Sequence, residues 1–461
     1  MTTTPFSVRG KRVVVIGAAR SGVAAAELLV RRGATVTLTD LRTSIDDEAR
    51  LRDAGVTLEL GGHRASTLTD ADLIVLSPGV PPGIEALDRA RAAGVPITGE
   101  LELASRWLRG RIVAITGTKG KSTTTTLAGR MLEAGGHHVL VGGNIGLALS
   151  AQVDASTDET IHVIEASSFQ LESAETFRPW IAVLLNFSPD HLDRHASVEE
   201  YGAAKARIFG QQTADDWAVL NADDPASLEL ARDARAQRLA FSMRGDAIEE
   251  GIAISGETIV KRTASGDEPL VPLASIKLLG RHLFADVLAA AAVASIAGVD
   301  SAAMTKAVEG FTGLEHALEP VAEVGGVRFV NDSKATNIEA AHRAIQSFGD
   351  GLVVILGGKF KGGSFGELLA PLRARRAHVV AIGEARPLIR EAFGDALPMH
   401  DAADMSAAVR TAFASAAPGG VVLLAPACAS FDMFKDYAER GRIFKQEVRR
   451  LQDNWSTTRE Q

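Results

Sequence analysis

The sequence predicts an α/β protein with three domains. These are a Rossmann-like N-terminal domain, a central P-loop ATPase-like parallel sheet with a small β insertion, and a C-terminal Rossmann-like α/β domain. Short apolar, β-branched runs recur along the chain, each followed by a polar turn and a segment of helical composition. The 461 residues exceed what a single hydrophobic core usually supports. One run ends in a glycine-rich loop of the phosphate-binding type. We place the domains at residues 1–109, 110–312 and 313–461.

The composition narrows the class of protein. Apolar residues make up 46% of the chain and charged residues 23%, the balance of a globular protein. The net charge of −8 argues against a general nucleic-acid or membrane-surface role. A single cysteine, Cys428, rules out an internal disulfide and fits a reducing compartment. The start shows no secretory signal, and no apolar run is long enough to span a bilayer. We therefore expect a cytoplasmic monomer without nucleic-acid or membrane partners.

The first domain opens with a strand–helix–strand unit. Residues 11–17 form a buried-strand pattern, residues 21–32 are rich in alanine and leucine, and residues 35–39 are β-branched. The turn Gly17-Ala-Ala-Arg-Ser-Gly22 lacks the middle glycine of the dinucleotide-binding fingerprint, so a nucleotide-diphosphate ligand fits it equally well. Asp40 closes the second strand, where either a nucleoside-contacting carboxylate or a solvated strand end is expected.

The central domain opens with a strand that runs into the phosphate loop. The segment Arg111-Ile-Val-Ala-Ile-Thr116 precedes Gly117-Thr-Lys-Gly-Lys-Ser-Thr123, and helical composition follows to about residue 137. Backbone N–H groups and the helix N-terminus can hold phosphate oxygens there. Lys121 would supply a positive charge, and Ser122 or Thr123 a hydroxyl for Mg²⁺. The two glycines are closer together than in the usual P-loop, and the alternative is an ordinary strand-to-helix turn.

The other elements follow the same alternation. Further strands are expected at residues 73–80 of the first domain, 161–164, 181–185 and 217–220 of the central domain, and 327–330, 352–356, 379–382 and 421–424 of the third domain. Residues 242–275 carry short alternating runs and predict a small β insertion or subdomain. Residues 287–297 predict an alanine-rich helix, and the polar tail from Asp453 is expected to fray.

Three polar residues of the central domain are candidates for chemistry, each with a simpler alternative. Glu165 ends a strand and could hold Mg²⁺ with the nucleotide, or could be a helix N-cap. His191 lies in a dense polar segment and could ligate a metal, contact phosphate or be merely solvated. Lys205 lies on a helix, and its pattern alone favours a surface lysine.

Three loops of the third domain follow strand ends. They span residues 330–337, 356–363 and 425–432, and they are rich in glycine, lysine and polar side chains. Because carboxyl ends of parallel strands share one edge of a sheet, we expect these loops to converge on one cleft. Cys428 has no obvious base beside it and is expected to be a small buried residue. The residues thus favour an enzyme that uses ATP and Mg²⁺.

Seven segments together resemble the Mur ligase family. They are residues 117–123, 142–146, 165–171, 190–194, 201–205, 331–337 and 430–434, in that order along nearly the whole chain. The resemblance points to the member that adds D-glutamate to UDP-N-acetylmuramoyl-L-alanine in peptidoglycan synthesis. It implies that ATP phosphorylates the L-alanine carboxylate and that the amine of D-glutamate attacks the acyl phosphate.

The resemblance also implies roles for individual residues. Catalytic roles fall on Lys121, His191 and Lys205. ATP contacts fall on Gly117, Thr118, Lys119, Gly120, Lys121, Ser122, Thr123, Asp286, Asp332 and Lys334. Contacts to the UDP-substrate fall on Ser21, Asp40, Arg42, Ser77, Pro78, Gly79 and Asn144. The D-glutamate pocket would comprise Thr336, Lys361, Ser430, Phe431 and Tyr437. Two Mg²⁺ ions would be held by Ser122, Glu165, His191 and Lys205, the last as a carbamate, because an ammonium group cannot ligate a metal.

Three positions depart from the family pattern. Leu283 and Asp286 replace two asparagines near the expected adenine contact. Ala317 replaces an arginine expected near the γ-phosphate, a loss that Arg281 or another cation would have to offset. The alternatives are therefore a sister ligase that uses another amino acid, such as L-glutamate, and a non-catalytic relative that binds a nucleotide sugar.

Overall fold

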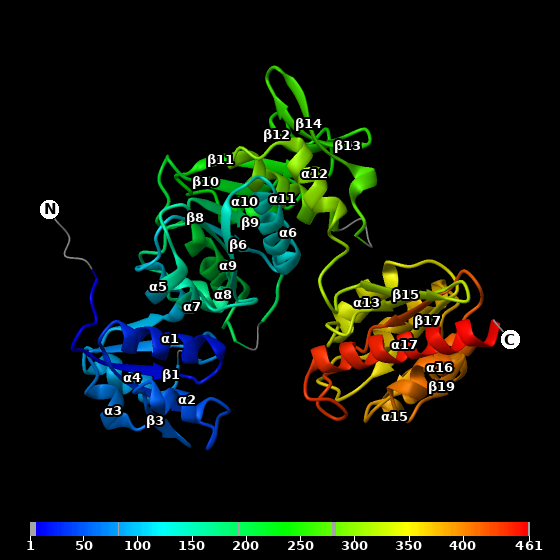
Figure 1. The fold of residues 1–461 in the computed structure, drawn as a ribbon, viewed down its shortest axis with the longest axis horizontal. Coiled ribbons are helices and arrows are strands. Elements are labelled where there is room, and N and C mark those ends of the chain that lie inside the picture. Colours follow the sequence, from blue (N-terminus) through cyan, green and yellow to red (C-terminus); the bar gives the residue numbers. More distant parts are fainter. Residues whose placement is uncertain (1–5, 82, 192–193, 279–282, 460–461) are drawn as a thin grey trace. The chain divides into compact units, whose positions relative to one another are not determined.

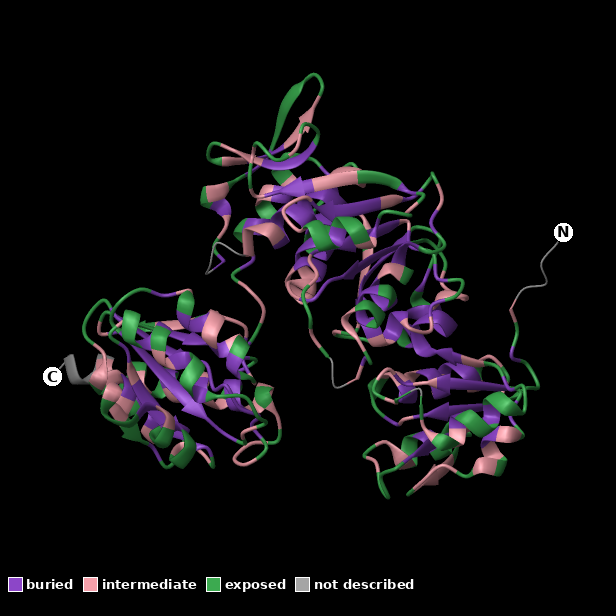
Figure 2. Cartoon of the chain, turned by 180° about the vertical axis from the view of Figure 1, so that it is seen from behind, coloured by how far each residue is buried: buried purple, intermediate pink, exposed green. Residues whose placement is uncertain are grey.

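The computed structural model describes residues 6–81, 83–191, 194–278 and 283–459 (Figure 1). The chain divides into two compact units, one formed by residues 1–276 with 282–311 and the other by residues 277–281 with 312–461. Figure 2 shows buried strands at the centre of each sheet and exposed residues on the outer faces of the helices. In these described ranges, no helix is both long and apolar enough to cross a membrane.

The N-terminal sheet is parallel and has the strand order β3-β2-β1-β4-β5. Its strands are β1 (Arg12–Ile16), β2 (Thr35–Asp40), β3 (Thr57–Leu60), β4 (Leu73–Leu76) and β5 (Ile97–Gly99). Its helices are α1 (Arg20–Arg31), α2 (Glu48–Asp53), α3 (Ala65–Thr69), α4 (Glu85–Ala92) and α5 (Glu100–Ser105). The chain leaves β1 towards β2 on one side and returns at β4 on the other. The carboxyl ends of β1 and β4 therefore flank a switch point, where such sheets bind ligands.

The first strand shows why the sequence folds in this way. Val13 and Val15 pack into a core on one face of the sheet, whereas Val14 and Ile16 pack into a core on the other face. A strand covered on both faces needs a continuous apolar run rather than an alternating one. The four consecutive apolar residues therefore specify a central strand of a parallel sheet.

The central sheet contains nine strands in the order β14-β13-β12-β11-β10-β9-β6-β8-β7. They are β6 (Arg111–Thr116), β7 (His138–Gly143), β8 (Thr160–Glu165), β9 (Ile181–Leu184), β10 (Trp217–Asn221), β11 (Gln237–Ser242), β12 (Gly251–Ser255), β13 (Thr258–Thr263) and β14 (Gly266–Pro272). The helices are α6 (Lys121–Ala134), α7 (Leu149–Gln152), α8 (Ser168–Leu171), α9 (Val198–Ala206), α10 (Pro225–Leu230), α11 (Phe284–Ile296) and α12 (Ser301–Glu309). Strands β12 to β14 pair antiparallel, and β12 joins β11, so the β insertion extends the main sheet instead of forming a separate subdomain.

The third sheet has the order β15-β16-β20-β17-β18-β19, with only the β15–β16 pair antiparallel. Its strands are β15 (Glu319–Val324), β16 (Val327–Asn331), β17 (Leu352–Gly357), β18 (His378–Ile382), β19 (Met399–Asp401) and β20 (Val421–Leu424). Its helices are α13 (Ile338–Gln346), α14 (Leu369–Ala374), α15 (Arg386–Phe393), α16 (Met405–Ser415) and α17 (Tyr437–Arg459). Apolar cores cover both faces, one including residues of α13 to α15 and the other residues of α16 and α17.

Three mainly parallel sheets confirm the predicted α/β class. The predicted fraying from Asp453 is wrong for the described residues, because α17 continues to Arg459. Trp455 explains part of this order, since its ring contacts Phe413 edge-on at a centroid distance of 5.2 Å. Several short strands were not predicted from the sequence, namely β3, β5, β7, β11, β15 and β19.

Candidate active site

The phosphate loop connects β6 to α6, as predicted. Gly117 and Gly120 have φ angles of +152° and +82°, which side-chain-bearing residues rarely adopt. A Cβ at Gly120 would also lie 2.1 Å from Asp286 Oδ1. Asn186 holds the loop from the end of β9: its carbonyl accepts from Thr118 N at 3.1 Å, and its side-chain oxygen accepts from Lys119 N at 2.9 Å. These hydrogen bonds hold the loop in place at the end of the sheet.

Two lysines meet at the carbonyl of Gly117. Lys121 Nζ donates to Gly117 O and Thr118 O, both at 2.9 Å, and Lys205 Nζ donates to Gly117 O at 2.8 Å. Lys205 is only 1% exposed, so the expectation of a surface lysine is wrong. Burial, together with the nearby Lys121 charge, lowers the pKa of Lys205 to about 7. A substantial neutral fraction of this amine therefore exists at neutral pH.

Glu165 links the phosphate loop to a neighbouring loop. Its carboxylate accepts from Ser122 Oγ at 2.6 Å and from Asn144 Nδ2 at 2.7 Å, and the residue is 2% exposed. It does not cap a helix, because Ser167 is the N-cap of α8. The N-cap alternative is therefore wrong, and the carboxylate is placed beside the hydroxyl expected to bind Mg²⁺.

The donor set around Glu165 suits Mg²⁺ in part. A carboxylate and a hydroxyl are the hard oxygen ligands that Mg²⁺ prefers alongside phosphate oxygens and water. Among the described residues, no group of three or more His, Cys, Asp or Glu side chains could hold a metal alone. A nucleotide phosphate would therefore have to complete such a site, as it does in many ATP-dependent enzymes.

The segment that contains His191 is tied to both sheets of its unit. His191 has a left-handed φ of 54°, is exposed, and contacts Phe169 edge-on at a centroid distance of 5.1 Å. Arg194 Cζ lies 5.1 Å from the centroid of the Phe169 ring, and its guanidinium donates to Val80 O at 3.1 Å. From the sequence, Arg194 was assigned no role, although its position between His191 and His195 could have marked it as a candidate. It connects the loop after β4 to the His191 segment.

A cavity of about 200 Å³ collects most of the predicted UDP-substrate contacts. Its lining includes Ser21, Ser77, Pro78, Gly79 and Asn144. Asn144 also contacts Glu165, so this cavity adjoins the phosphate loop region. A second cavity of about 220 Å³ shares Ser77 and Pro78 with it. The structure thus brings together residues from the first and central domains that are far apart in the sequence.

Asp40 and Arg42, the other two residues predicted to contact this substrate, lie outside the linings of these cavities. Asp40 accepts from Ala18 N at 2.7 Å and from Arg42 Nη2 at 2.9 Å. The Arg42 hydrogen bond holds the pKa of the Asp40 carboxyl well below its usual range. The solvated-strand-end alternative is wrong, because Asp40 is buried and anchors the turn after β1.

Asp286 is a buried carboxyl group at the start of α11. It is 5% exposed, and its Oδ2 has no hydrogen-bond partner in the described structure. Burial raises the pKa of Asp286 well above its ordinary value and thus favours the neutral carboxyl group. A neutral carboxyl resembles the amide of the asparagine that the family pattern places here. Its contact with Gly120 supports the prediction that it lies near the nucleotide.

We predict that Asp286→Asn makes stability less dependent on pH. Because the folded-state pKa is raised, the stability that the protonated group provides is full below the unfolded value near 3.8 and is lost as pH rises towards the folded value. Asparagine does not titrate, so the melting temperature of the variant minus that of the wild type should increase as pH rises. Asp233→Asn, whose side chain is 91% exposed, is the control and should leave the profile unchanged. An equal pH slope in wild type and Asp286→Asn would contradict the burial argument.

The three strand-end loops of the third sheet lie together, as predicted. Lys361 Nζ donates to Thr336 Oγ1 at 3.4 Å. Lys359 and Ala429 exchange two backbone hydrogen bonds of 2.9 and 3.0 Å, and Ala427 N donates to Ala335 O at 2.9 Å. Of the remaining predicted pocket residues, Ser430 is buried, whereas Phe431 and Tyr437 are exposed. Exposed aromatic rings beside a loop cluster are consistent with a ligand-binding surface.

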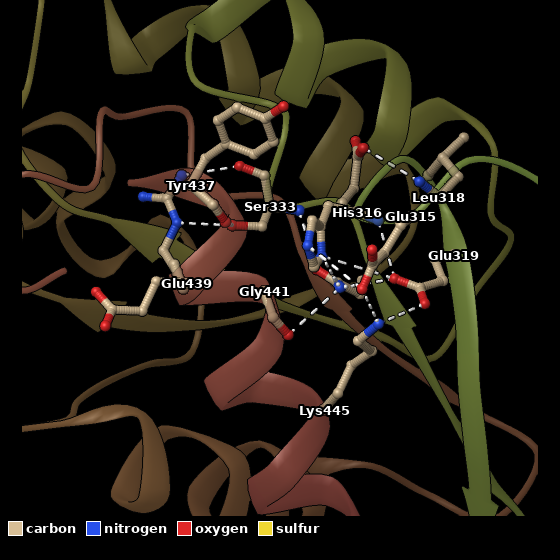
Figure 3. Close-up of polar contacts among 12 residues, drawn as sticks. Glu315, His316, Leu318, Glu319, Ser333, Tyr437, Glu439, Gly441 and Lys445 are labelled. Atoms are coloured by element: carbon tan, nitrogen blue, oxygen red, sulfur yellow. Dashed lines mark hydrogen bonds and ion pairs between the residues drawn. The ribbon is translucent and has the colours of Figure 1, made fainter. Parts of the chain in front are cut away.

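A polar network surrounds the end of β16 and the start of α17 (Figure 3). Asn331 Nδ2 donates to Glu319 Oε2 at 3.0 Å and also lies 2.9 Å from His316 Nδ1. Asp332 accepts from Leu318 N at 3.1 Å, and burial raises its pKa to about 7. Lys334 is exposed, although its backbone N–H donates to His316 O at 3.0 Å. Asp332 and Lys334, both predicted to contact the nucleotide, therefore lie in different environments, one buried and one exposed.

The departure at Ala317 lies within this network. Lys445 of α17 forms ion pairs with Glu315 at 2.7 Å and Glu319 at 2.8 Å (Figure 3). It is already engaged and does not replace a missing phosphate-binding arginine. Arg281, the other suggested substitute, lies outside the described residues. Cys428 is fully buried, and burial raises its pKa to about 12, which fits the predicted inert thiol.

Comparison with known proteins gives the same assignment for each part of the chain. Residues 11–99 match the model of the Mur ligase MurD-like N-terminal domain, residues 115–294 the Mur ligase middle domain, and residues 318–428 the Mur ligase glutamate ligase domain. A UDP-N-acetylmuramoylalanine–D-glutamate ligase from Acidobacterium capsulatum is 48% identical over 95% of this chain and 96% of its own length. Another from Koribacter versatilis is 45% identical over 97% of this chain and 99% of its own length.

Solved structures share the fold at lower identity. A UDP-N-acetylmuramate-alanine ligase from Thermotoga maritima superposes with a TM-score of 0.59 at 19% identity, covering 96% of this chain and 100% of its own. A pseudomurein peptide ligase type C from Methanothermus fervidus gives 0.58 at 17% identity, with coverage of 96% and 100%. These similarities support the three-domain α/β architecture predicted from the sequence.

Proposed function

Because this chain belongs to the Mur ligase family, we propose that it is the ATP-dependent ligase that joins D-glutamate to UDP-N-acetylmuramoyl-L-alanine, a step of peptidoglycan precursor synthesis. The observation that carries the proposal is a continuous series of hydrogen bonds in the first unit, which links the cavity to the phosphate loop. Asn144 lines the substrate cavity and contacts Glu165, and Glu165 contacts Ser122 of the phosphate loop. A carboxylate seated near Asn144 would thus be close to a nucleotide held by the loop.

The chemistry requires charge compensation. A carboxylate is a poor electrophile, and it repels the triphosphate that must activate it. Phosphoryl transfer gives an acyl phosphate and ADP; the amine of D-glutamate then adds to the acyl carbon, and loss of inorganic phosphate leaves the new amide. Lys121 and the backbone N–H groups of the loop would stabilise the transferred phosphoryl group. Lys205, on the same carbonyl as Lys121, lies beside this position.

We extend the proposal to the cofactors. Mg²⁺ would neutralise phosphate charge during transfer, and Ser122 and Glu165 would hold one ion with the nucleotide. A second ion would require His191 and a carbamylated Lys205. The buried, partly neutral amine of Lys205 supports carbamylation, because only a neutral amine reacts with carbon dioxide. The carbamate would convert a hydrogen-bond donor into an anionic oxygen ligand.

The third domain would bind the amino acid. Lys361 and Thr336 lie within hydrogen-bonding distance of each other and could both contact a side-chain carboxylate. Ser430, Phe431 and Tyr437 come from the adjoining loop and helix. Asp332 and Lys334 would contact the nucleotide. We also propose that the protein acts as a monomer in the cytoplasm, where its substrates occur.

Phosphate release from ATP in the presence of UDP-N-acetylmuramoyl-L-alanine tests the function. We expect release with D-glutamate and little or none with L-glutamate or other amino acids. Release with a different amino acid but none with D-glutamate would favour a sister ligase. No ATP turnover with any amino acid would favour a non-catalytic relative. The loss of the arginine at position 317 would then explain the missing activity.

A further inference from the structure

A fully buried arginine joins the loops of the third domain. Arg440 lies in the first turn of α17 and is 0% exposed. Its guanidinium donates from Nε to Ser333 Oγ and from Nη2 to Ser333 O, both at 2.9 Å, and from Nη1 to Cys428 O at 3.1 Å. Ser333 Oγ in turn donates to Tyr437 O at 2.7 Å (Figure 3). One side chain thus connects the loop after β16, the loop after β20 and the start of α17.

The third strand-end loop passes close to this guanidinium. Gly358 follows β17 with a left-handed φ of +132°. A Cβ at this position would lie 3.2 Å from Arg440 Nη1 and 2.3 Å from Ala429 O. The absence of a side chain at Gly358 therefore lets the backbone of this loop approach both Arg440 and the loop after β20. Two of the loops that carry the predicted D-glutamate contacts are thus bonded to Arg440, and the third passes beside it.

The charge of this group is unusual for its location. All three of its hydrogen bonds go to a hydroxyl or to backbone carbonyls, and no carboxylate of the described chain forms an ion pair with it. Burial lowers the pKa of Arg440 only to about 10, so the guanidinium stays charged at neutral pH. Burying a cation without a directly paired anion is costly, and the charge of Asp432 in the loop after β20 compensates it only in part. The remaining positive charge would favour an anionic ligand at the adjoining loops.

We propose that Arg440 is a positioning residue for the amino-acid substrate, which fixes the three loops in their binding arrangement and favours a substrate that carries two carboxylates. This inference rests on the proposed ligase function. It assigns to Arg440 no contact with the substrate itself. Its effect passes through Ser333 to Tyr437 and through the loop carbonyls to the segments that carry Lys361 and Ser430.

The test compares steady-state kinetics of Arg440→Lys, Arg440→Met and Ser333→Ala. Lysine keeps the positive charge but loses the several hydrogen-bond donors of the guanidinium, and methionine loses both. Ser333→Ala removes the hydroxyl that accepts from Arg440 and donates to Tyr437 O. We expect Arg440→Lys to raise the KM for D-glutamate about tenfold, the usual effect of losing one hydrogen bond to a charged group. Arg440→Met should raise it further and Ser333→Ala less. The KM for the UDP-substrate should stay unchanged, because its cavity lies in the other unit.

Arg375→Lys is the matched control. Arg375 also donates to three backbone carbonyls, those of Phe348, Pro371 and Gln346, but it lies away from the strand-end loops. The Arg375→Lys variant should have a lower melting temperature but an unchanged KM for D-glutamate. If Arg440→Lys and Ser333→Ala lower the melting temperature but leave that KM unchanged, Arg440 is only structural and the inference is wrong. Ser333→Ala decides the matter if Arg440→Met does not fold. A wild-type protein that releases no phosphate with D-glutamate would instead overturn the proposed function.

Discussion

Lys121→Ala should abolish phosphate release while leaving binding of the UDP-substrate nearly unchanged. Lys121 Nζ lies within 2.9 Å of two carbonyls of the phosphate loop, so it is placed to move onto a bound phosphate. Removing a preorganised charge at a transferring phosphoryl group typically costs about a hundredfold or more in turnover. Isothermal titration with UDP-N-acetylmuramoyl-L-alanine would measure binding, which should persist because the cavity proposed for this substrate does not include Lys121.

The control for this variant is Lys306→Ala. Lys306 is an exposed lysine on α12 of the same unit. It should keep wild-type turnover and binding. Near-normal turnover of Lys121→Ala would refute the assignment of residues 117–123 as the phosphate loop, and a large loss of UDP-substrate binding would show that the two sites are not separable.

Lys205→Ala should also lose turnover, and short carboxylates such as acetate should restore part of it. The alanine leaves space at a position that is buried beside Gly117 O. A small carboxylate could supply there the oxygen ligands that a carbamate would provide. Phosphate release should therefore rise with added acetate in Lys205→Ala but not in Lys121→Ala, which serves as the matched control.

Two further results would separate the possible roles of Lys205. Removing carbon dioxide from the buffer should lower the activity of the wild type if the carbamate forms, and adding bicarbonate should restore it. Full activity of Lys205→Ala without any added carboxylate would rule out the carbamate. If Lys205→Ala loses activity and does not respond to carboxylates, the remaining role for Lys205 is that of a cation that contacts phosphate.

Local sequence patterns were sufficient for much of the first unit. The run of four apolar residues in β1 packs on both faces of its sheet, and that pattern already predicted a parallel α/β core. The phosphate loop is also local, because its glycines and the start of α6 are adjacent in the chain. The order of short motifs gave the family and the predicted substrate contacts, five of which line one cavity.

Burial of polar side chains was much harder to predict. Lys205 was expected on the surface from its pattern, yet its amine reaches a carbonyl 88 residues earlier in the chain. Asp40 was open to two interpretations until the Ala18 and Arg42 hydrogen bonds were seen. Arg194 had no predicted role, although it links segments 114 residues apart.

The sequence by itself therefore determined the α/β class, the phosphate loop, the family and most candidate residues. These depend on interactions between neighbours in the chain, such as the apolar period of a strand or the backbone freedom of a glycine turn. Only the tertiary structure decided which polar groups lose water and what they contact. Arg440 shows the reason: Ser333 lies 107 residues away and Cys428 only 12, and no periodicity within α17 encodes that both meet one guanidinium.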